Sequence, residues 1–89
     1  MNIDEILLKL NGYADIKNES LSGLASITIK LTEDLDNGVI SPAEYAELLA
    51  DLEVVKVITE DAADLRAQEE LHKLIDIAIT IASTAAKAM

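Results

Sequence analysis

The sequence predicts an all-α protein folded as a single helical domain over residues 1–89. Three observations lead to this fold class. Apolar residues recur at spacings of three and four along most of the chain. Helix breakers are scarce, with one proline and three glycines. Phe and Trp are absent and there are two tyrosines, so Leu, Ile, Val and Ala must build the core, as suits closely packed helices. A chain of 89 residues has room for one modest core and excludes a second domain.

A short N-terminal helix is expected from about residue 3 to residue 10. Asn2 can cap it, and Asn11-Gly12 is a typical stop signal. A helix of this length is not stable alone in water, so it should dock on a longer one. Its apolar stripe is Ile3, Ile6, Leu7 and Leu10.

A second helix is expected over about residues 19–36 and should end at Asn37-Gly38. Residues 26–32 also alternate apolar and polar side chains, with several β-branched residues, as a strand would. The helical spacing extends over the whole segment and the alternation does not, which favours the helix. The helical stripe consists of Leu21, Leu24, Thr28, Leu31 and Leu35.

The strongest local signal is Ser41-Pro42-Ala43-Glu44, which combines a cap, a first-turn proline and a glutamate at the reciprocal capping position. The short connection before it predicts an antiparallel hairpin of helices at about 19–36 and 42–67. The stretch Leu35–Tyr45 resembles the short helical hairpins often called SHOCT, which share a glycine, an apolar pair, a Ser or Thr cap, and a glutamate before an aromatic residue. This resemblance implies oligomerisation.

A long C-terminal helix follows, because no glycine or proline occurs after Pro42. The helix is either continuous from residue 42 to residue 87 or broken near Thr59. The β-branched residues of Val54–Ile58 and the possible fresh start at Thr59-Glu60-Asp61 favour a break. No internal repeat is evident. The predicted seam is Tyr45, Leu48, Leu52, Val55, Ile58, Ala62 and Leu65, and it resumes at Leu71, Ile75, Ala78, Ala82 and Ala85.

The second helix can cover the next one only to about residue 60, which would leave the C-terminal half bare. Residues 74–86 are apolar around most of the helix, a pattern typical of a helix buried on all sides. We therefore expect another protein chain, in a homo-oligomer or a larger assembly, to cover it. A monomeric three-helix bundle that folds back at Thr59 is the alternative. The expected interface residues are Leu71, Leu74, Ile75, Ala78, Ile79 and Ala82.

The formal net charge of −10 lies mainly in residues 31–70, which hold twelve acids against Lys56 and Arg66. Phosphate binding needs clustered Lys and Arg, so direct nucleic-acid binding is not expected. The acids suit a solvated helix face or a basic protein partner. Residues 74–86 are too few to span a membrane, and the acidic start is unlike a signal peptide. A cytoplasmic location is the expectation.

Few residues suggest a catalytic or metal-binding role. Without cysteine there is no thiolate nucleophile and no Cys-based zinc site. Glu69-x-x-His72 has the spacing of di-iron carboxylate ligands, although Glu69–Lys73 and His72–Asp76 pairing explains it equally simply. The stretch from Glu33 to Glu44 resembles the second half of an EF-hand calcium loop, but Leu35 stands where a ligand is needed.

These observations predict no enzymatic activity, no catalytic residue, no metal and no cofactor. The expected function is that of a helical protein–protein interaction or assembly protein that oligomerises through its C-terminal helix, as a coiled coil does. The alternative is an acidic regulator, or a nucleic-acid-mimicking inhibitor, that docks on a basic protein surface.

Overall fold

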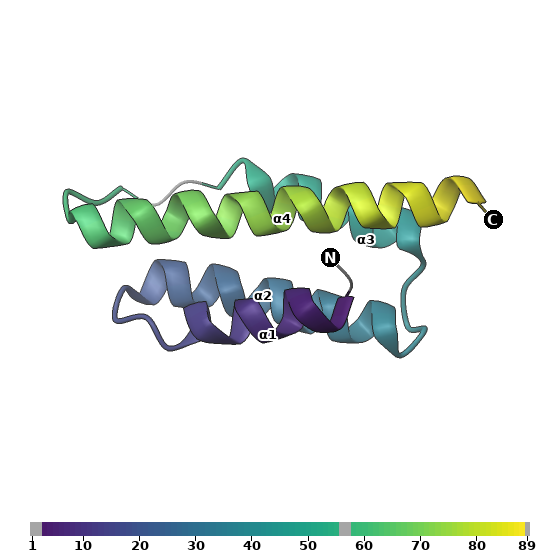
Figure 1. Ribbon diagram of the computed structural model, residues 1–89, viewed down its shortest axis with the longest axis horizontal. Helices are drawn as coiled ribbons and strands as arrows, with labels where there is room; N and C mark the ends of the chain where they lie inside the picture. Colours follow the sequence, from purple (N-terminus) through teal and green to yellow (C-terminus); the bar gives the residue numbers. More distant parts are fainter. Residues whose placement is uncertain (1–2, 56–57, 89) are drawn as a thin grey trace.

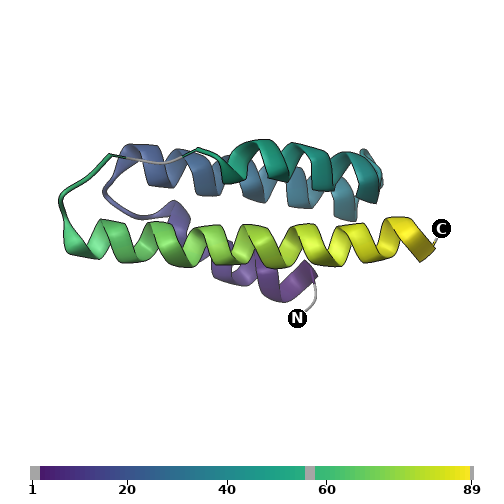
Figure 2. The ribbon, with the colours of Figure 1, turned by 90° about the horizontal axis from the view of Figure 1, so that it is seen from above.

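The computed structural model describes residues 3–55 and 58–88 and confirms the all-α fold. Four helices follow one another, α1 (Ile3–Ala14), α2 (Glu19–Asp36), α3 (Pro42–Glu53) and α4 (Ala62–Ala88). Successive helices run in opposite directions and form a bundle measuring 43 × 20 × 20 Å (Figures 1 and 2). A helix of 27 residues is about 40 Å long, so α4 extends along almost the whole bundle.

The helix starts follow the capping signals in the sequence. Asn18 caps α2, and its Oδ1 accepts hydrogen bonds from the backbone N–H groups of Ser20 and Leu21. Ser41 and Glu44 form the predicted capping box at the start of α3, with both bonds at 3.2 Å. Between these two helices Gly38 adopts a φ of +75°, which glycine permits without strain. The expected cap of α1, Asn2, lies outside the described residues.

Helix α1 continues past its predicted stop at Asn11-Gly12 to Ala14. The Asn11 side chain donates a hydrogen bond to the Leu7 carbonyl 2.9 Å away, so it supports the helix instead of ending it. The extra turn brings Tyr13 against the core.

The hairpin predicted at 19–36 and 42–67 is shorter than expected, because α3 ends at Glu53. A helix continuous from 42 to 87 is excluded by the non-helical segment before Ala62. Asp61 Oδ1 accepts hydrogen bonds from the backbone N–H groups of Ala63 at 2.8 Å and Asp64 at 3.2 Å, which makes it the cap of α4. The connection continues the line of α3 past the first turns of α4 and then reverses (Figures 1 and 2).

The two halves of the bundle share one burial pattern, which is a repeat that the sequence alone did not show. Each half consists of a short helix with two buried residues four apart, followed by a longer helix with five buried residues. The spacing of these five residues is the same in both long helices. The short helices contribute Ile6 and Leu10 on α1, and Tyr45 and Leu49 on α3. The long helices contribute Leu21, Leu24, Ala25, Thr28 and Thr32 on α2, and Leu71, Leu74, Ile75, Ala78 and Ala82 on α4.

Two threonines place hydroxyl groups in the core of α2. Thr28 and Thr32 are both fully buried, and each hydroxyl donates to the carbonyl four residues earlier, at 2.8 and 2.7 Å. Tyr45 Oη lies 2.6 Å from Thr32 Oγ1. Since the single Thr32 proton already serves the Thr28 carbonyl, Tyr45 is the donor in this bond. Burial raises the pKa of Tyr45.

The two ends of the Tyr45–Thr32 bond should respond differently to substitution. Tyr45→Phe removes one hydrogen bond while the Thr32 hydroxyl keeps its carbonyl acceptor, so it should cost about 1 kcal/mol of unfolding free energy. Thr32→Val leaves the Tyr45 hydroxyl buried without an acceptor and should cost about 1–3 kcal/mol. Urea unfolding followed by circular dichroism measures both. A larger loss for Tyr45→Phe than for Thr32→Val would contradict the assigned donor.

Candidate functional site

The residues expected to form an intermolecular interface lie inside this chain. Leu71, Ile75 and Ala78 are fully buried, and Leu74 and Ala82 are 6% and 1% exposed. Ile79 is partly buried against the same core. We expected one short helix, residues 19–36, to cover the C-terminal helix. The reversal of the chain before α4 instead lets α1, α2 and α3 all contact α4. These six residues therefore have a structural role in the folded chain.

Part of the predicted seam lies on the surface instead. Four of its large apolar members are well exposed, and Val54 beside them is 78% exposed. The reason is the end of α3 at Glu53, because beyond it the chain no longer follows helical spacing. We call this set the connection surface, and it consists of Leu48, Val54, Val55, Ile58 and Leu65.

Acidic side chains border the connection surface. On α3, Glu44, Glu47 and Asp51 are exposed and lie at spacings of three and four, along one stripe of the helix. Residues 42–53 contain no Lys or Arg. On the exposed side of α3, Leu48 therefore lies among carboxylates that no basic residue of the same helix offsets.

An open groove of about 510 Å³ adjoins this surface between the end of α3 and α4. Glu53 and Leu65 form one part of its lining. The side chains of Glu53 and Asp76 are hydrogen-bonded to each other, and this bond, followed by burial and the charge of Asp76, raises the pKa of Glu53. Two neighbouring carboxyl groups disfavour the charged form of one of them, which is the direction of this shift. The remaining lining residues are Gln68, Glu69, His72 and Lys73.

Glu69 and His72 were considered as metal ligands, and both line this groove. The Nε2 atom of His72 is buried and has no hydrogen-bond partner. Asp76, the residue expected beside His72, is hydrogen-bonded to Glu53. Within residues 3–55 and 58–88, no group of three or more His, Asp or Glu side chains is placed to hold a metal ion.

The stretch that resembles half of an EF-hand forms the turn between α2 and α3. Glu44, which would be the bidentate ligand, instead accepts a hydrogen bond from the Ser41 backbone N–H. Its carboxylate thus caps a helix, and this use explains why the EF-hand likeness is confined to the turn residues.

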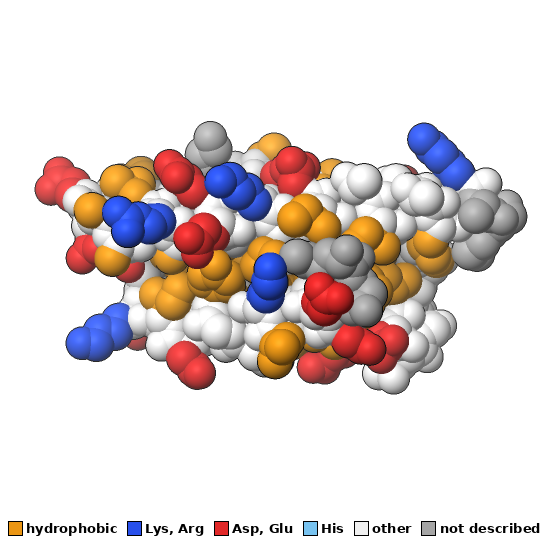
Figure 3. All heavy atoms as spheres, viewed as in Figure 1, with side chains coloured by type: hydrophobic (Ala, Val, Ile, Leu, Met, Phe, Trp, Pro, Cys, Tyr) orange, Lys and Arg blue, Asp and Glu red, His pale blue; other side chains and the backbone are white. Residues whose placement is uncertain are grey.

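Two further grooves lie along the other side of α4. One, between α1 and α4, is lined by Lys9, Tyr13 and Glu70 among others. Tyr13 donates a 2.6 Å hydrogen bond to Glu70, and burial, followed by this bond and the charge of Glu70, raises the pKa of Tyr13 to about 12. Apolar side chains run along this seam, and charged ones project outward (Figure 3).

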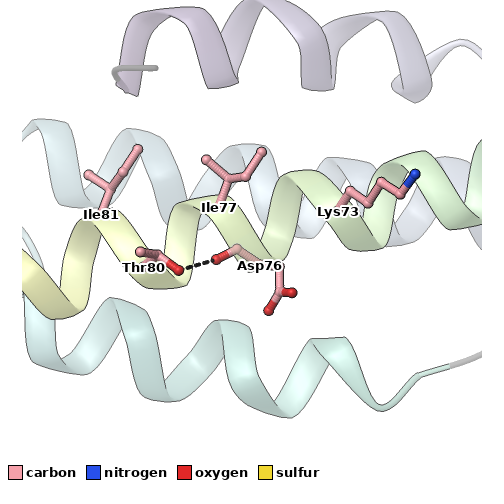
Figure 4. A pocket seen from close by; sticks show the side chains of 5 residues that line it. All are labelled: Lys73, Asp76, Ile77, Thr80 and Ile81. Atoms are coloured by element: carbon pink, nitrogen blue, oxygen red, sulfur yellow. Dashed lines mark hydrogen bonds between the residues drawn. The ribbon is translucent and has the colours of Figure 1, made fainter.

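The last groove, of about 400 Å³, follows the next turns of α4. Ile77 and Ile81 point toward α1, while the Asp76 carboxylate points toward α3 (Figure 4). The Thr80 hydroxyl donates to the Asp76 backbone carbonyl at 3.0 Å. This side of α4 thus offers two isoleucines and Lys73 in a shallow depression.

None of the helices in the described part of the chain has the length and hydropathy that crossing a membrane requires. Sequence reasoning missed the connection surface because it assigned four of its residues to a buried seam. The available signal was the β-branched run Val54–Ile58, which disfavours helix and lies next to the acids of α3.

A charged residue at Ala78 should unfold the protein and not merely dissociate an assembly. Ala78→Glu puts a carboxylate in a fully closed core position and should cost more than about 3 kcal/mol. The matched control Ile77→Glu, at a neighbour that is 37% exposed, should cost less than about 1 kcal/mol. Thermal unfolding by circular dichroism compares the two. A folded Ala78→Glu variant of reduced mass in light scattering would restore the intermolecular interpretation of α4.

Replacing the Glu53 carboxyl by a neutral amide should stabilise the protein near neutral pH. A raised pKa means that this contact stabilises the fold fully below the ordinary pKa of Glu and loses that effect as pH rises through the raised value. Glu53→Gln can donate to Asp76 at any pH, so unfolding free energy at pH 7 should rise by a few tenths to about 1 kcal/mol. The gain should shrink at pH 4. Glu47→Gln, with the same change in net charge on the exposed stripe, is the control, and an equal gain there would contradict this interpretation.

Comparisons of the chain with protein-family models, with curated proteins and with solved structures gave no match. The SHOCT-like turn chemistry between α2 and α3 is therefore a local resemblance. Functional inference rests on the geometry of the chain itself, and within that geometry the connection surface is the feature that the fold leaves uncovered.

Proposed function

We propose that this chain is a non-enzymatic helical protein that binds another protein through its connection surface. The observation that supports the proposal is the concentration of exposed apolar side chains. The described residues include nine large apolar side chains that are well exposed, and five of them lie within residues 48–65. Single exposed apolar residues are common on soluble domains, whereas a contiguous group is typical of a contact surface.

The geometry of this surface favours a protein over a small ligand. Sites for small molecules are enclosed and cover most of the ligand. Here the apolar residues lie on the outside of α3 and on the connection, and the adjoining groove is open to solvent. A partner with an extended face of its own can cover such a surface, and an acidic border adds specificity to the contact.

Oligomerisation also remains part of the proposal, but by a different route from the one first expected. The residues of α4 that were expected at the interface are buried in the core of this chain. The connection surface, which holds five of the nine exposed large apolar residues of the described chain, is the contact we propose for a second copy.

Photo-crosslinking tests the proposal and identifies the type of partner. A photoreactive residue replaces Ile58, which is fully exposed, and in a control chain it replaces Leu8, which is 75% exposed on α1. We expect a discrete adduct from position 58 and none from position 8 when the protein is irradiated in an extract of its source cells. An adduct at twice the chain mass in the purified protein would identify a second copy. Absence of adducts at position 58 under both conditions would contradict protein binding by this surface.

The acidic regulator is the second candidate function. It is supported by the distribution of charge, since residues 31–53 hold seven acids and no Lys or Arg. Such a regulator would act by charge alone, so its binding would fall steeply with salt and would not depend on Val54 or Ile58. Binding that survives salt but fails on Ile58→Ser favours the first candidate.

A further inference from the structure

Resting on the proposed function, we infer that the partner element which binds the connection surface is an amphipathic helix whose polar side carries Lys and Arg. Helices of this kind bind an apolar strip through residues at positions i, i+3, i+4 and i+7, and their flanking charges fix the orientation. Three features of the molecule support this partner: the exposed apolar residues, the acids around them and the groove beside them.

The exposed apolar residues lie on α3, on the connection after it and on the first turns of α4. Leu48 and Val55 are seven residues apart along the direction of α3, and Leu52 between them is partly buried against the core. The backbone N–H of Val55 still bonds to the Leu52 carbonyl at 3.0 Å, so the last turn keeps the strip in line. Leu65 of α4 borders the same groove as Glu53, at the end of α3. This strip can receive the apolar side of one partner helix.

The acidic residues beside the strip favour a partner with positively charged side chains. Glu44, Glu47 and Asp51 follow the strip on α3, and no basic residue of that helix offsets them. A second copy of this chain would bring two such stripes together in a partly desolvated contact, and like charges in that position cost several kcal/mol. Lys or Arg residues flanking an apolar helix face would instead meet the carboxylates of α3.

The groove offers a place for one long basic side chain. Its volume of about 510 Å³ lies beside Leu65, and Glu53 lines it at its α3 side. A Lys ammonium or an Arg guanidinium can form charge-assisted hydrogen bonds with the Glu53 carboxylate in this groove. Lys73 also lines the groove.

A synthetic helical peptide provides a probe that does not require the natural partner. The probe is an amphipathic Leu/Lys peptide of about 18 residues with leucines on one side. Two controls are a scrambled peptide of identical composition and a Leu/Glu peptide with the same leucine positions. Fluorescence anisotropy or titration calorimetry measures each affinity for the full chain. We expect the helical Leu/Lys peptide to bind with a Kd of about 1–10 µM and to outcompete both controls by about tenfold or more.

Variants of the chain then locate the contact. Val54→Ser/Ile58→Ser and Glu47→Gln/Asp51→Asn should each weaken binding by about tenfold, because they remove apolar and charged contacts separately. The matched controls are Leu8→Ser/Val39→Ser, two equally exposed apolar residues elsewhere, and Asp4→Asn/Asp15→Asn, two exposed acids near the N-terminus. These controls should bind as the unchanged chain does. Circular dichroism verifies that every variant is folded.

Several results would overturn the inference. These are absence of peptide binding, equal binding of the scrambled and helical Leu/Lys peptides, tight binding of the Leu/Glu peptide, and equal weakening by the site and control variants. If Ile58 crosslinks to a protein while the Leu/Lys peptide fails to bind, the basic helix is wrong and the proposed function stands. If neither experiment succeeds, both are wrong.

Discussion

The arrangement of the whole bundle depends on the reversal of the chain between Glu53 and Ala62, which is held by a small hydrogen-bond network around Asp64. Asn18, the cap of α2, donates to Asp64 at 3.1 Å, and Thr59 in the connection lies 3.4 Å from the same oxygen. This network joins the starts of α2 and α4 at one end of the molecule. Without the reversal, α4 would continue away from its partners and its apolar circumference would be exposed. With it, a helix of 27 residues finds cover from three shorter helices.

Sequence reasoning succeeded where the signal was local and failed where it depended on that reversal. The bounds of α2 and the capping box at Ser41 were predictable, because Asn18, Gly38, Ser41 and Glu44 act on the backbone directly beside them. The end of α3 involves neither glycine nor proline, and β-branched residues only weaken a helix. Because the sequence does not fix where α3 ends, it does not fix which helices pack against α4 either. As a result, residues 71–82 were assigned to an interface and belong to the core, whereas Leu48, Val55, Ile58 and Leu65 were assigned to a seam and lie outside.

The repeated burial pattern shows where the two halves of the bundle differ. Helix α2 begins two residues before its first buried position, Leu21, whereas α4 begins nine residues before the equivalent Leu71. The connection passes beside these additional turns of α4, where the shorter half of the bundle has no counterpart (Figure 2). The shared pattern accounts for the core. The extra turns and the connection contribute nothing to that pattern, which is why the exposed apolar residues gather there.

The negative charge of the chain affects which partners can bind the connection surface. A protein with a net charge of −10 repels copies of itself, and the repulsion is strongest where carboxylates are least offset, as they are on α3. An apolar contact alone would favour any hydrophobic partner, and acids alone would favour any cation. The two together, on the exposed side of α3, suit the proposed partner, in which apolar and basic residues alternate with the same period. An amphipathic basic helix has that period, because its own residues three and four apart share a face.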